Sequence, residues 1–456
     1  MADNKYGVLD IKEQKMVKDK EHFTGGKTEG GITSSYATDD GVKLKVPYSF
    51  FGSIYDDAER EAALAAMAQD SLTMGPKTQE FQNKFAAYHK VKYAFACSNC
   101  TTGMHVVTQI FDIKPGDEVI VTPNTFVATS LAILKEGGTP VFADIDPRTF
   151  NIDPEEVAKK VTNKTKAIYV VHYGGLMVDM DPIMEIAQKY NLRVLEDCAH
   201  ATGATYKGRF AGSIGDAGAF SFHSLKNITT CGEGGMITTN RDDYAYPIQN
   251  LRCMSNNVAW ANAKNEWNFG DKITCKKTSN LEYWLPAHFD VMPYNGHWGS
   301  NYRMNEIQAA VGCCQLDKLP MLTAKRREIA HKITKGLKGV KGIETVYEPD
   351  YANHVFHLYT LCVNERELGG SRDEFMRVLY EEEGVQGILH YQPTFHFTGL
   401  RMMGYDPNQC PIASEFFYKR ELNLPMHPRL TDEAIATMVK GIKNAAAKIR
   451  KRHCKA

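Results

Sequence analysis

Hydrophobic and polar residues alternate along the chain with two different periods. From about Val46 to Arg303, short apolar runs are separated by stretches in which apolar residues recur every three or four positions. The short runs predict buried strands and the longer stretches predict amphipathic helices. The predicted strands are YAFAC, EVIVTP, PVFADI, AIYVVHY and RVLEDC, and the predicted helices include EREAALAAMAQD, TQEFQNKFAAYHK and DPIMEIAQKYN. This alternation predicts an α/β fold with a mostly parallel sheet, whose ligands bind beyond the carboxyl ends of the strands.

The pattern changes after Arg303, and this change suggests how the chain divides. One or two long helices are followed by a strand-like run and a closing helix, in the segments NEIQAAVGCCQLDKLPMLTAKRREIAHKITKGL, HVFHLYTLCV and DEAIATMVKGIKNAAAKIRKR. We therefore expect a large domain over residues 46–318 and a smaller C-terminal α+β domain over 319–456. Residues 1–45 are polar and lack a sustained period, which predicts an N-terminal arm outside the core.

Composition narrows the class of protein. With 456 residues and 43% hydrophobic content the chain can bury a large core, and Lys+Arg and Asp+Glu are balanced at 54 each. This balance predicts no general attraction to nucleic acid or to an anionic membrane. No apolar run approaches the about 20 residues that span a bilayer, and the first residues lack the apolar core of a secretory signal, so we expect a cytoplasmic protein.

The cysteines suggest reduced thiols. Eleven are scattered along the chain, which is typical of buried thiols in a reducing compartment and not of a disulfide framework. Cys97 and Cys100 form a CxxC pair, but no second pair follows at zinc spacing. We therefore expect no metal site.

Four side chains fit the needs of a pyridoxal 5'-phosphate (PLP) site, which requires a lysine, a carboxylate, a ring partner and phosphate donors. Lys226 lies where an apolar run ends in a Gly-rich turn, which favours a desolvated amine of lowered pKa. Asp197 ends a predicted strand, His200 follows three residues later, and Phe126 follows another strand. Each also has an ordinary alternative: a solvated lysine, a helix cap, a structural histidine and a core phenylalanine.

Phosphate donors are predicted at two further places. Thr101 and Thr102 stand at the entry to a helix in CSNCTTGMH, and Ser221 precedes the lysine. Hydroxyl groups and backbone amides at a helix N-terminus favour a phosphate.

The order and joint context of these motifs resemble the DegT/DnrJ/StrS family of PLP-dependent sugar aminotransferases. The likeness runs from about Val46 nearly to the C-terminus, through LTMGPKTQEFQNKFAAYHKVKYA, TPNTFVATSLAILKEGGTPVFADIDPRTFNIDP, LEDCAHATGATYKG, GSIGDAGAFSFHSLKNITTCGEGGMITTN and GSNYRMNEIQAAVG. It implies the fold-type I, aspartate aminotransferase-like architecture. By this resemblance Lys226 is the Schiff-base lysine, Asp197 pairs with the pyridine nitrogen, His200 lies near the ring hydroxyl and Phe126 stacks on the ring. The resemblance also implies phosphate-binding roles for Thr101, Thr102 and Ser221.

The resemblance further implies a shared active site. Asn301, in GSNYRM, matches a family position that reaches the cofactor phosphate of the partner subunit, and Arg303 beside it is a second candidate. We therefore expect a homodimer or a dimer of dimers. The chain departs from the family pattern at Cys100, where Gly is usual, in its longer arm, and in the longer stretch between MITTN and GSNYRM.

The implied reaction moves an amino group from glutamate or glutamine to a small-molecule acceptor, a nucleotide-linked keto-deoxysugar or a keto-cyclitol. Two alternatives stay open. A PLP-dependent sugar dehydratase of the same fold carries His in place of the lysine, so Lys226 argues against it. A non-enzymatic regulatory or sensing protein would not need the complete set of cofactor groups.

An aromatic-rich insertion over about residues 254–298 contains all four tryptophans of the chain. We expect it to cover the substrate entrance, with Trp260 and Trp267 contacting a sugar ring or base. The alternative is that these rings pack the insertion onto the body or onto a dimer interface.

Overall fold

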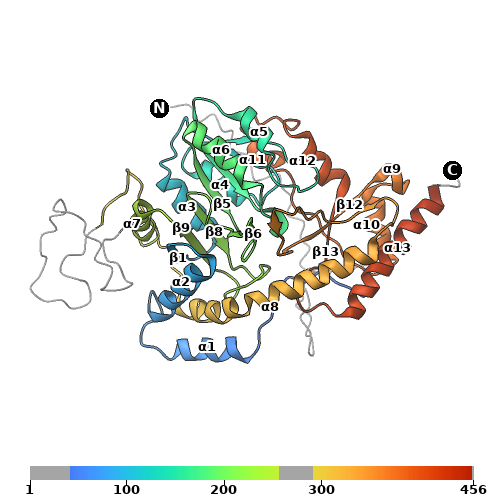
Figure 1. The fold of residues 1–456 in the computed structure, drawn as a ribbon, viewed down its shortest axis with the longest axis horizontal. Helices are drawn as coiled ribbons and strands as arrows, with labels where there is room; N and C mark the ends of the chain where they lie inside the picture. The colour runs from blue at the N-terminus through green and yellow to red at the C-terminus, as the bar shows by residue number, and fades with distance from the viewer. Residues whose placement is uncertain (1–41, 256–290, 454–456) are drawn as a thin grey trace, which may run out of the picture. The chain divides into compact units, whose positions relative to one another are not determined.

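The computed structural model describes residues 42–255 and 291–453. Its centre is a seven-stranded sheet in the order β1-β9-β8-β5-β4-β2-β3 (Figure 1). β9 runs antiparallel to its neighbours β1 and β8, and the other neighbouring strands of this sheet pair in parallel. The strands are β1 (Tyr93–Cys97), β2 (Glu118–Val121), β3 (Thr139–Phe142), β4 (Thr165–Val171), β5 (Arg193–Asp197), β8 (Ala217–Ser221) and β9 (Gly235–Thr239). The prediction of a mostly parallel sheet is confirmed.

Both faces of this sheet are buried, which explains why its strands are apolar throughout. In β4, Ala167 and Tyr169 belong to one hydrophobic core and Ile168 and Val170 to the other, because successive side chains point to opposite faces. The first core is covered by α3 (Cys100–Ile110), α4 (Ala128–Lys135) and α7 (Asp242–Leu251). The second is covered by α2 (Pro76–His89), α5 (Pro154–Lys160), α6 (Met180–Tyr190) and the first half of α8 (Glu306–Leu337).

The C-terminal part builds a smaller α+β unit around a third core. Its antiparallel sheet has the order β10-β12-β13, with β10 (Ile343–Glu344), β12 (Tyr359–Val363) and β13 (Glu421–Leu424). The second half of α8, α9 (Glu365–Leu368), α10 (Arg372–Glu381) and α13 (Asp432–His453) contribute its helical side chains. The prediction of a smaller C-terminal α+β unit is confirmed.

The exact division at residue 318 stays a prediction, because the chain does not break there. α8 runs through this position, packing against α1 (Asp57–Met67) and α2 in its first half and near α13 further on (Figure 1). Side chains of residues 395–416 belong to the first core, and Val46 belongs to the third. Periodicity does not reveal such crossings between units.

The remaining elements are short. A small sheet has the order β11-β6-β7, formed by β6 (Thr205–Tyr206), β7 (Arg209–Phe210) and β11 (Ala352–Asn353). Two helices, α11 (Thr398–Met402) and α12 (Pro411–Glu415), lie in the C-terminal part.

The predicted strand HVFHLYTLCV forms a strand only in its second half. β12 begins at Tyr359, and the residues before it bond elsewhere. The Val355 N–H donates to the Gly175 carbonyl (3.1 Å) and the Leu358 N–H to the Gly174 carbonyl (3.0 Å). This half therefore packs against the turn that follows β4 instead of extending the C-terminal sheet.

The first residue of α8 caps the N-terminus of α2. Gly75, the N-cap of α2, has no side chain to bond the free amides. The Glu306 carboxylate replaces it, since Oε1 accepts from the N–H groups of Gly75 (2.8 Å) and Thr78 (3.0 Å) and Oε2 from that of Lys77 (2.7 Å). Glu306 is fully buried, so its charge depends on these bonds and on the positive end of the α2 dipole.

We expect Glu306→Ala to loosen the start of α2, because three backbone amides, those of Gly75, Lys77 and Thr78, lose their acceptor. The local free energy of opening should fall by about 2–3 kcal/mol. Hydrogen–deuterium exchange of the peptide that contains Lys77 and Thr78 measures this loss directly. Glu306→Gln keeps one carbonyl acceptor and serves as the intermediate control. Unchanged protection of both amides in the alanine variant would show that Glu306 is not their cap.

Candidate active site

A cavity of about 360 Å³ opens at the carboxyl ends of the parallel strands. Its walls come from the segments that follow β1, β2, β5 and β8, where the sequence predicted a ligand site. Six of the predicted site residues line it: Thr101, Phe126, Asp197, His200, Ser221 and Lys226. Segments far apart in sequence are therefore brought to one place.

Lys226 lies in the loop after β8, within the cavity wall. Gly52 packs against this loop so closely that a Cβ there would lie 2.1 Å from the Leu225 carbonyl oxygen. The pKa of Lys226 is lowered to about 8, because burial penalises the ammonium more than the nearby Asp197 and Cys100 favour it. A substantial fraction of this amine is therefore neutral near physiological pH.

Asp197 ends β5 with its carboxylate buried against the cavity. The Thr129 hydroxyl donates to Oδ2 (2.8 Å) and the Ala199 N–H donates to Oδ1 (3.0 Å). Burial raises the pKa of Asp197, although these two bonds and the charge of Lys226 act in the opposite direction. A cation that bonds this carboxylate inside the cavity would relieve the cost of burying it.

Cys100, which departs from the family pattern, is the first residue of α3 and lines the same cavity. Its Sγ lies 3.9 Å from Oδ1 of Asp197. Burial and the Asp197 charge both raise the thiol pKa, so this cysteine is a neutral side chain.

His200 is held between the protein backbone and a tyrosine. The Gly174 N–H donates to Nδ1 of His200 (3.3 Å), and Nε2 lies 3.1 Å from the Tyr391 hydroxyl oxygen. Because Nδ1 accepts, the ring proton is on Nε2. Burial and the charge of Lys226 hold the pKa of His200 well below its usual range.

Phe126 is 59% exposed and does not belong to a core. Its ring lies 6.2 Å from the Tyr391 ring, at the cavity wall. An exposed aromatic ring in a cavity is available to a flat ligand, which the alternative of a core phenylalanine does not explain.

Comparison with known proteins identifies the family. The model of the DegT/DnrJ/EryC1/StrS aminotransferase family matches residues 54–443. The chain belongs to this family. Like other DegT/DnrJ/EryC1/StrS aminotransferases it is a PLP-dependent enzyme, and the family includes sugar aminotransferases.

Relatives and solved structures agree with this assignment. The spore coat polysaccharide biosynthesis protein SpsC of Bacillus subtilis is 36% identical over 404 residues, covering 88% of this chain and 96% of its own. The GDP-perosamine synthase of Caulobacter vibrioides is 36% identical over 394 residues, covering 84% and 94%. A putative sugar aminotransferase from Streptococcus pneumoniae, solved in its PLP form, has a TM-score of 0.75 at 26% identity and covers 89% of this chain and 99% of its own.

The donor set of the cavity fits the PLP of this family. One cavity contains a lysine with a pKa near 8, a buried carboxylate, an exposed phenylalanine ring, and hydroxyl groups at the start of α3 and the end of β8.

None of the helices in the described part of the chain has the length and apolar character needed to span a membrane.

Thr102 lies outside the cavity, unlike Thr101 and Ser221. Its hydroxyl donates to the Asn99 carbonyl (2.8 Å) and its N–H donates to Oδ1 of Asn99 (2.9 Å). Both groups therefore cap α3. The sequence placed Thr102 at the helix entry correctly but did not reveal that Asn99 occupies its donors.

Asn301 and Arg303, two further predicted residues, also lie away from this cavity. Asn301 is exposed, and its backbone pairs with that of Cys253 in an isolated antiparallel β-bridge. Arg303 is half-buried. Trp260 and Trp267 are outside the described residues. At the end of the insertion, His297 contacts Glu136 (3.0 Å) and Asp112 (3.2 Å), which ties the chain back to the body.

Among the site residues that were missed from the sequence are Thr129, His390 and Tyr391. Thr129 lies three residues after Phe126, so a helical turn beginning at Phe126 was a usable signal. His390 and Tyr391 come from the C-terminal part, and no local pattern connects them to Lys226. Only the tertiary structure places them in the cavity wall.

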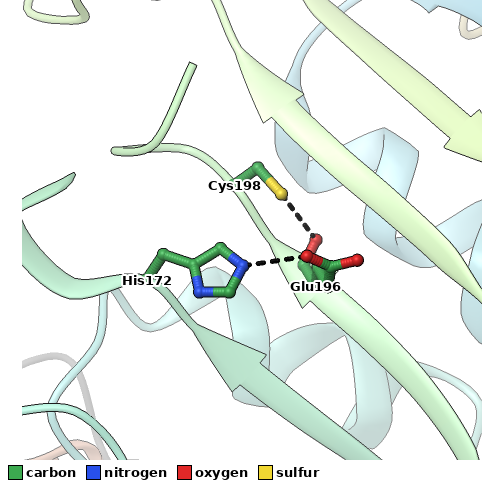
Figure 2. Close-up of side chains that lie close together, drawn as sticks. All are labelled: His172, Glu196 and Cys198. Carbon is green, nitrogen blue, oxygen red and sulfur yellow. Dashed lines mark hydrogen bonds and ion pairs between the residues drawn. The ribbon is translucent and has the colours of Figure 1, made fainter. Parts of the chain in front are cut away.

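A buried cluster beside the site, His172, Glu196 and Cys198, has the residue types of a metal site (Figure 2). Its groups are already bonded. Glu196 accepts from His172 Nε2 (3.0 Å) and from the N–H groups of Gly212 (2.9 Å), Ile214 (2.8 Å) and Gly215 (2.6 Å). The Cys198 Sγ lies 3.5 Å from the Glu196 carbonyl oxygen. The cluster therefore anchors the loop before β8.

We expect acylation of Lys226 in cofactor-free protein to follow a titration centred near pH 8. Only the neutral amine reacts, so the rate should rise about tenfold from pH 7 to pH 9 and then level off. Mass spectrometry of the Lys226 peptide after short exposure to acetic anhydride measures this, with the exposed Lys166 as reference in each sample. A rate that still rises steeply above pH 10 would contradict the lowered pKa.

Proposed function

We propose that the enzyme moves an amino group from glutamate or glutamine to the carbonyl carbon of a keto-sugar. A nucleotide-linked keto-deoxysugar is the favoured acceptor, and a keto-cyclitol is the alternative. The observation that carries the proposal is the convergence of Lys226, Asp197 and Phe126 on one cavity. The names of the two relatives, a GDP-perosamine synthase and a polysaccharide biosynthesis protein, support the sugar acceptor.

Lys226 and Asp197 would perform the proton chemistry. When bound, PLP supplies a pyridine ring that withdraws electrons from the carbon carrying the amino group. Nζ of Lys226 would hold the cofactor until the amino donor displaces it, and the freed neutral amine would then take the α-proton of the donor and later return a proton to the acceptor carbon. The negative charge of the Asp197 carboxylate would keep a proton on the ring nitrogen, and the protonated ring would in turn offset the cost of burying that charge.

The other cavity residues would bind and orient the cofactor. Phe126 offers a ring face, and His200, whose Nε2 bonds the Tyr391 hydroxyl, would lie near the ring hydroxyl. Thr101 and Ser221 offer hydroxyl groups to the phosphate beside the N-terminus of α3. We leave Thr102 out of this set, because Asn99 occupies its donors.

The two alternatives are less well supported. A dehydratase of this fold would carry His at position 226, where the chain has Lys. A regulatory protein without activity would have no use for an amine whose pKa is lowered to about 8 beside a buried carboxylate.

We expect Lys226→Ala to remain folded, since it removes a costly buried ammonium, but to form no borohydride-reducible link to PLP.

A second variant, Asp197→Asn, should bind PLP and lose about 100-fold or more in turnover. Absorption spectra and mass spectrometry after reduction test the first, and steady-state assays the second. Lys207→Ala, at an exposed lysine paired with Asp181, is the control. Normal turnover of Asp197→Asn would show that another group holds the ring nitrogen.

Screening defines the substrate. Purified enzyme with PLP and glutamate, or glutamine, should release the keto acid of the donor in the presence of one class of acceptor only. The panel contains nucleotide-linked keto-deoxysugars, free keto-sugars and keto-cyclitols, and the aminated product is identified by mass spectrometry. Removal of water from a sugar without amination would favour the dehydratase instead.

We also propose a homodimer, or a dimer of dimers, in which Asn301 reaches the partner's cofactor phosphate, with Arg303 as a second contact. Two observations support it: Asn301 is exposed and lies outside the cavity of its own chain. Two-fold symmetry is also the commonest arrangement of such enzymes. The contact of Trp260 and Trp267 with substrate stays a prediction.

Mixed subunits test the shared site. Lys226→Ala protein and Asn301→Ala protein should each be poorly active at limiting PLP. After subunit exchange in an equal mixture, half of the dimers are mixed and each contains one intact site, so about a quarter of the wild-type activity should return. No recovery after verified exchange, or full activity in a monomer by light scattering, would refute the shared site.

A further inference from the structure

One wall of the cavity consists of hydrogen-bonding rings that carry no charge. His200, His390 and Tyr391 line it beside Lys226. Burial and the charge of Lys226 lower the pKa of His390 to about 4, and burial likewise keeps His200 neutral. His390 has no role in the proton and cofactor chemistry described above.

The His390 backbone is fixed from both sides. Its N–H donates to Oε1 of Glu421 (2.7 Å), and its carbonyl accepts from the Tyr173 hydroxyl (2.7 Å). Glu421 is itself fully buried and accepts from Nδ2 of Asn423 (2.7 Å) through its other oxygen. The backbone of His390 is therefore held between the C-terminal unit and the turn that follows β4.

The His390 side chain is incompletely bonded. Its Nδ1 is buried without a hydrogen-bond partner among the described residues, so a ligand in the cavity can reach only Nε2, which no described residue bonds. Leaving such a group unpaired costs about 1–3 kcal/mol, so buried polar atoms normally have a partner. Its two neighbours in the wall differ in this respect, since His200 and Tyr391 bond each other (3.1 Å).

We propose that His390 is a specificity-determining residue that hydrogen-bonds a hydroxyl group of the keto-sugar acceptor. This inference rests on the proposed function. The Nε2 of a neutral imidazole donates or accepts according to which ring nitrogen carries the proton, and a hydroxyl group can bond it in either case. The amino donor instead presents carboxylates, which require cationic partners. His390 therefore distinguishes the second substrate from the first.

Separate measurement of the two half-reactions tests this assignment. His390→Leu should lower kcat/KM for the keto-sugar by about tenfold, the value of one hydrogen bond between neutral groups. The donor half-reaction, followed as loss of the visible PLP band on adding glutamate, should change by less than about twofold. His390→Asn and His390→Gln each keep a polar atom near one ring nitrogen, and one of them should recover most of the loss.

His427→Leu is the matched control. His427 is another histidine whose buried Nδ1 lacks a partner among the described residues, but it does not line this cavity. Its replacement should leave the ratio of the two half-reaction rates unchanged. Equal losses in both half-reactions of His390→Leu, or no loss in either, would overturn the proposal.

Acceptor analogues test the same contact in the wild-type enzyme, in case His390→Leu does not fold. In a series of keto-sugars that each lack one hydroxyl group, one analogue should be aminated with a kcat/KM about tenfold below that of the full sugar. Of His390→Asn and His390→Gln, the variant that does not recover activity should use this analogue and the full sugar equally well. If no single hydroxyl group matters, the proposal fails. If glutamate removes the visible band but no keto-sugar is aminated, the proposed function fails independently of His390.

Discussion

The pairing of a buried amine with a buried carboxylate is the constraint on which this site depends. Lys226 and Asp197 lie in one cavity, and the protein lowers the pKa of the first and raises that of the second. Burial alone would favour the neutral form of each, and their mutual attraction opposes this only partly. The outcome is an amine that can exchange protons near neutral pH beside a carboxylate that favours a proton on its partner. Neither property is available to the same side chains in water.

The end of β5 shows how the scaffold supports this pair. Glu196 and Asp197 are adjacent, so their side chains point to opposite faces of the sheet. Asp197 faces the cavity, while Glu196 bonds His172 and three backbone amides of the loop before β8. Although burial acts to raise it, the pKa of Glu196 is lowered by these bonds. One carboxylate thus fixes the strand that positions the other, and two acidic neighbours have separate tasks.

The C-terminal unit completes the cavity from the other side. Residues His390 and Tyr391 of this unit supply a neutral polar wall, and α8, which the two units share, caps α2 through its first residue, Glu306. The backbone of His390 is hydrogen-bonded to Glu421 on one side and to Tyr173, which follows β4, on the other, so this wall is connected to both sheets.

The sequence by itself determined the large sheet, its carboxyl edge as the ligand site and six residues that meet there. It could do so because parallel strands are apolar on both faces and because Lys226, Asp197 and Phe126 each follow a strand of the same sheet. The sequence could not show where the two units divide, or that the first half of HVFHLYTLCV does not join the C-terminal sheet. Periodicity indicates that a side chain is buried, but it does not indicate against which unit the side chain packs. The engagement of Thr102 by Asn99 and the arrival of His390 and Tyr391 beside Lys226 were decided only by the tertiary structure. These contacts depend on hydrogen-bond geometry and on packing between segments far apart in the chain, which leave no local pattern in the sequence.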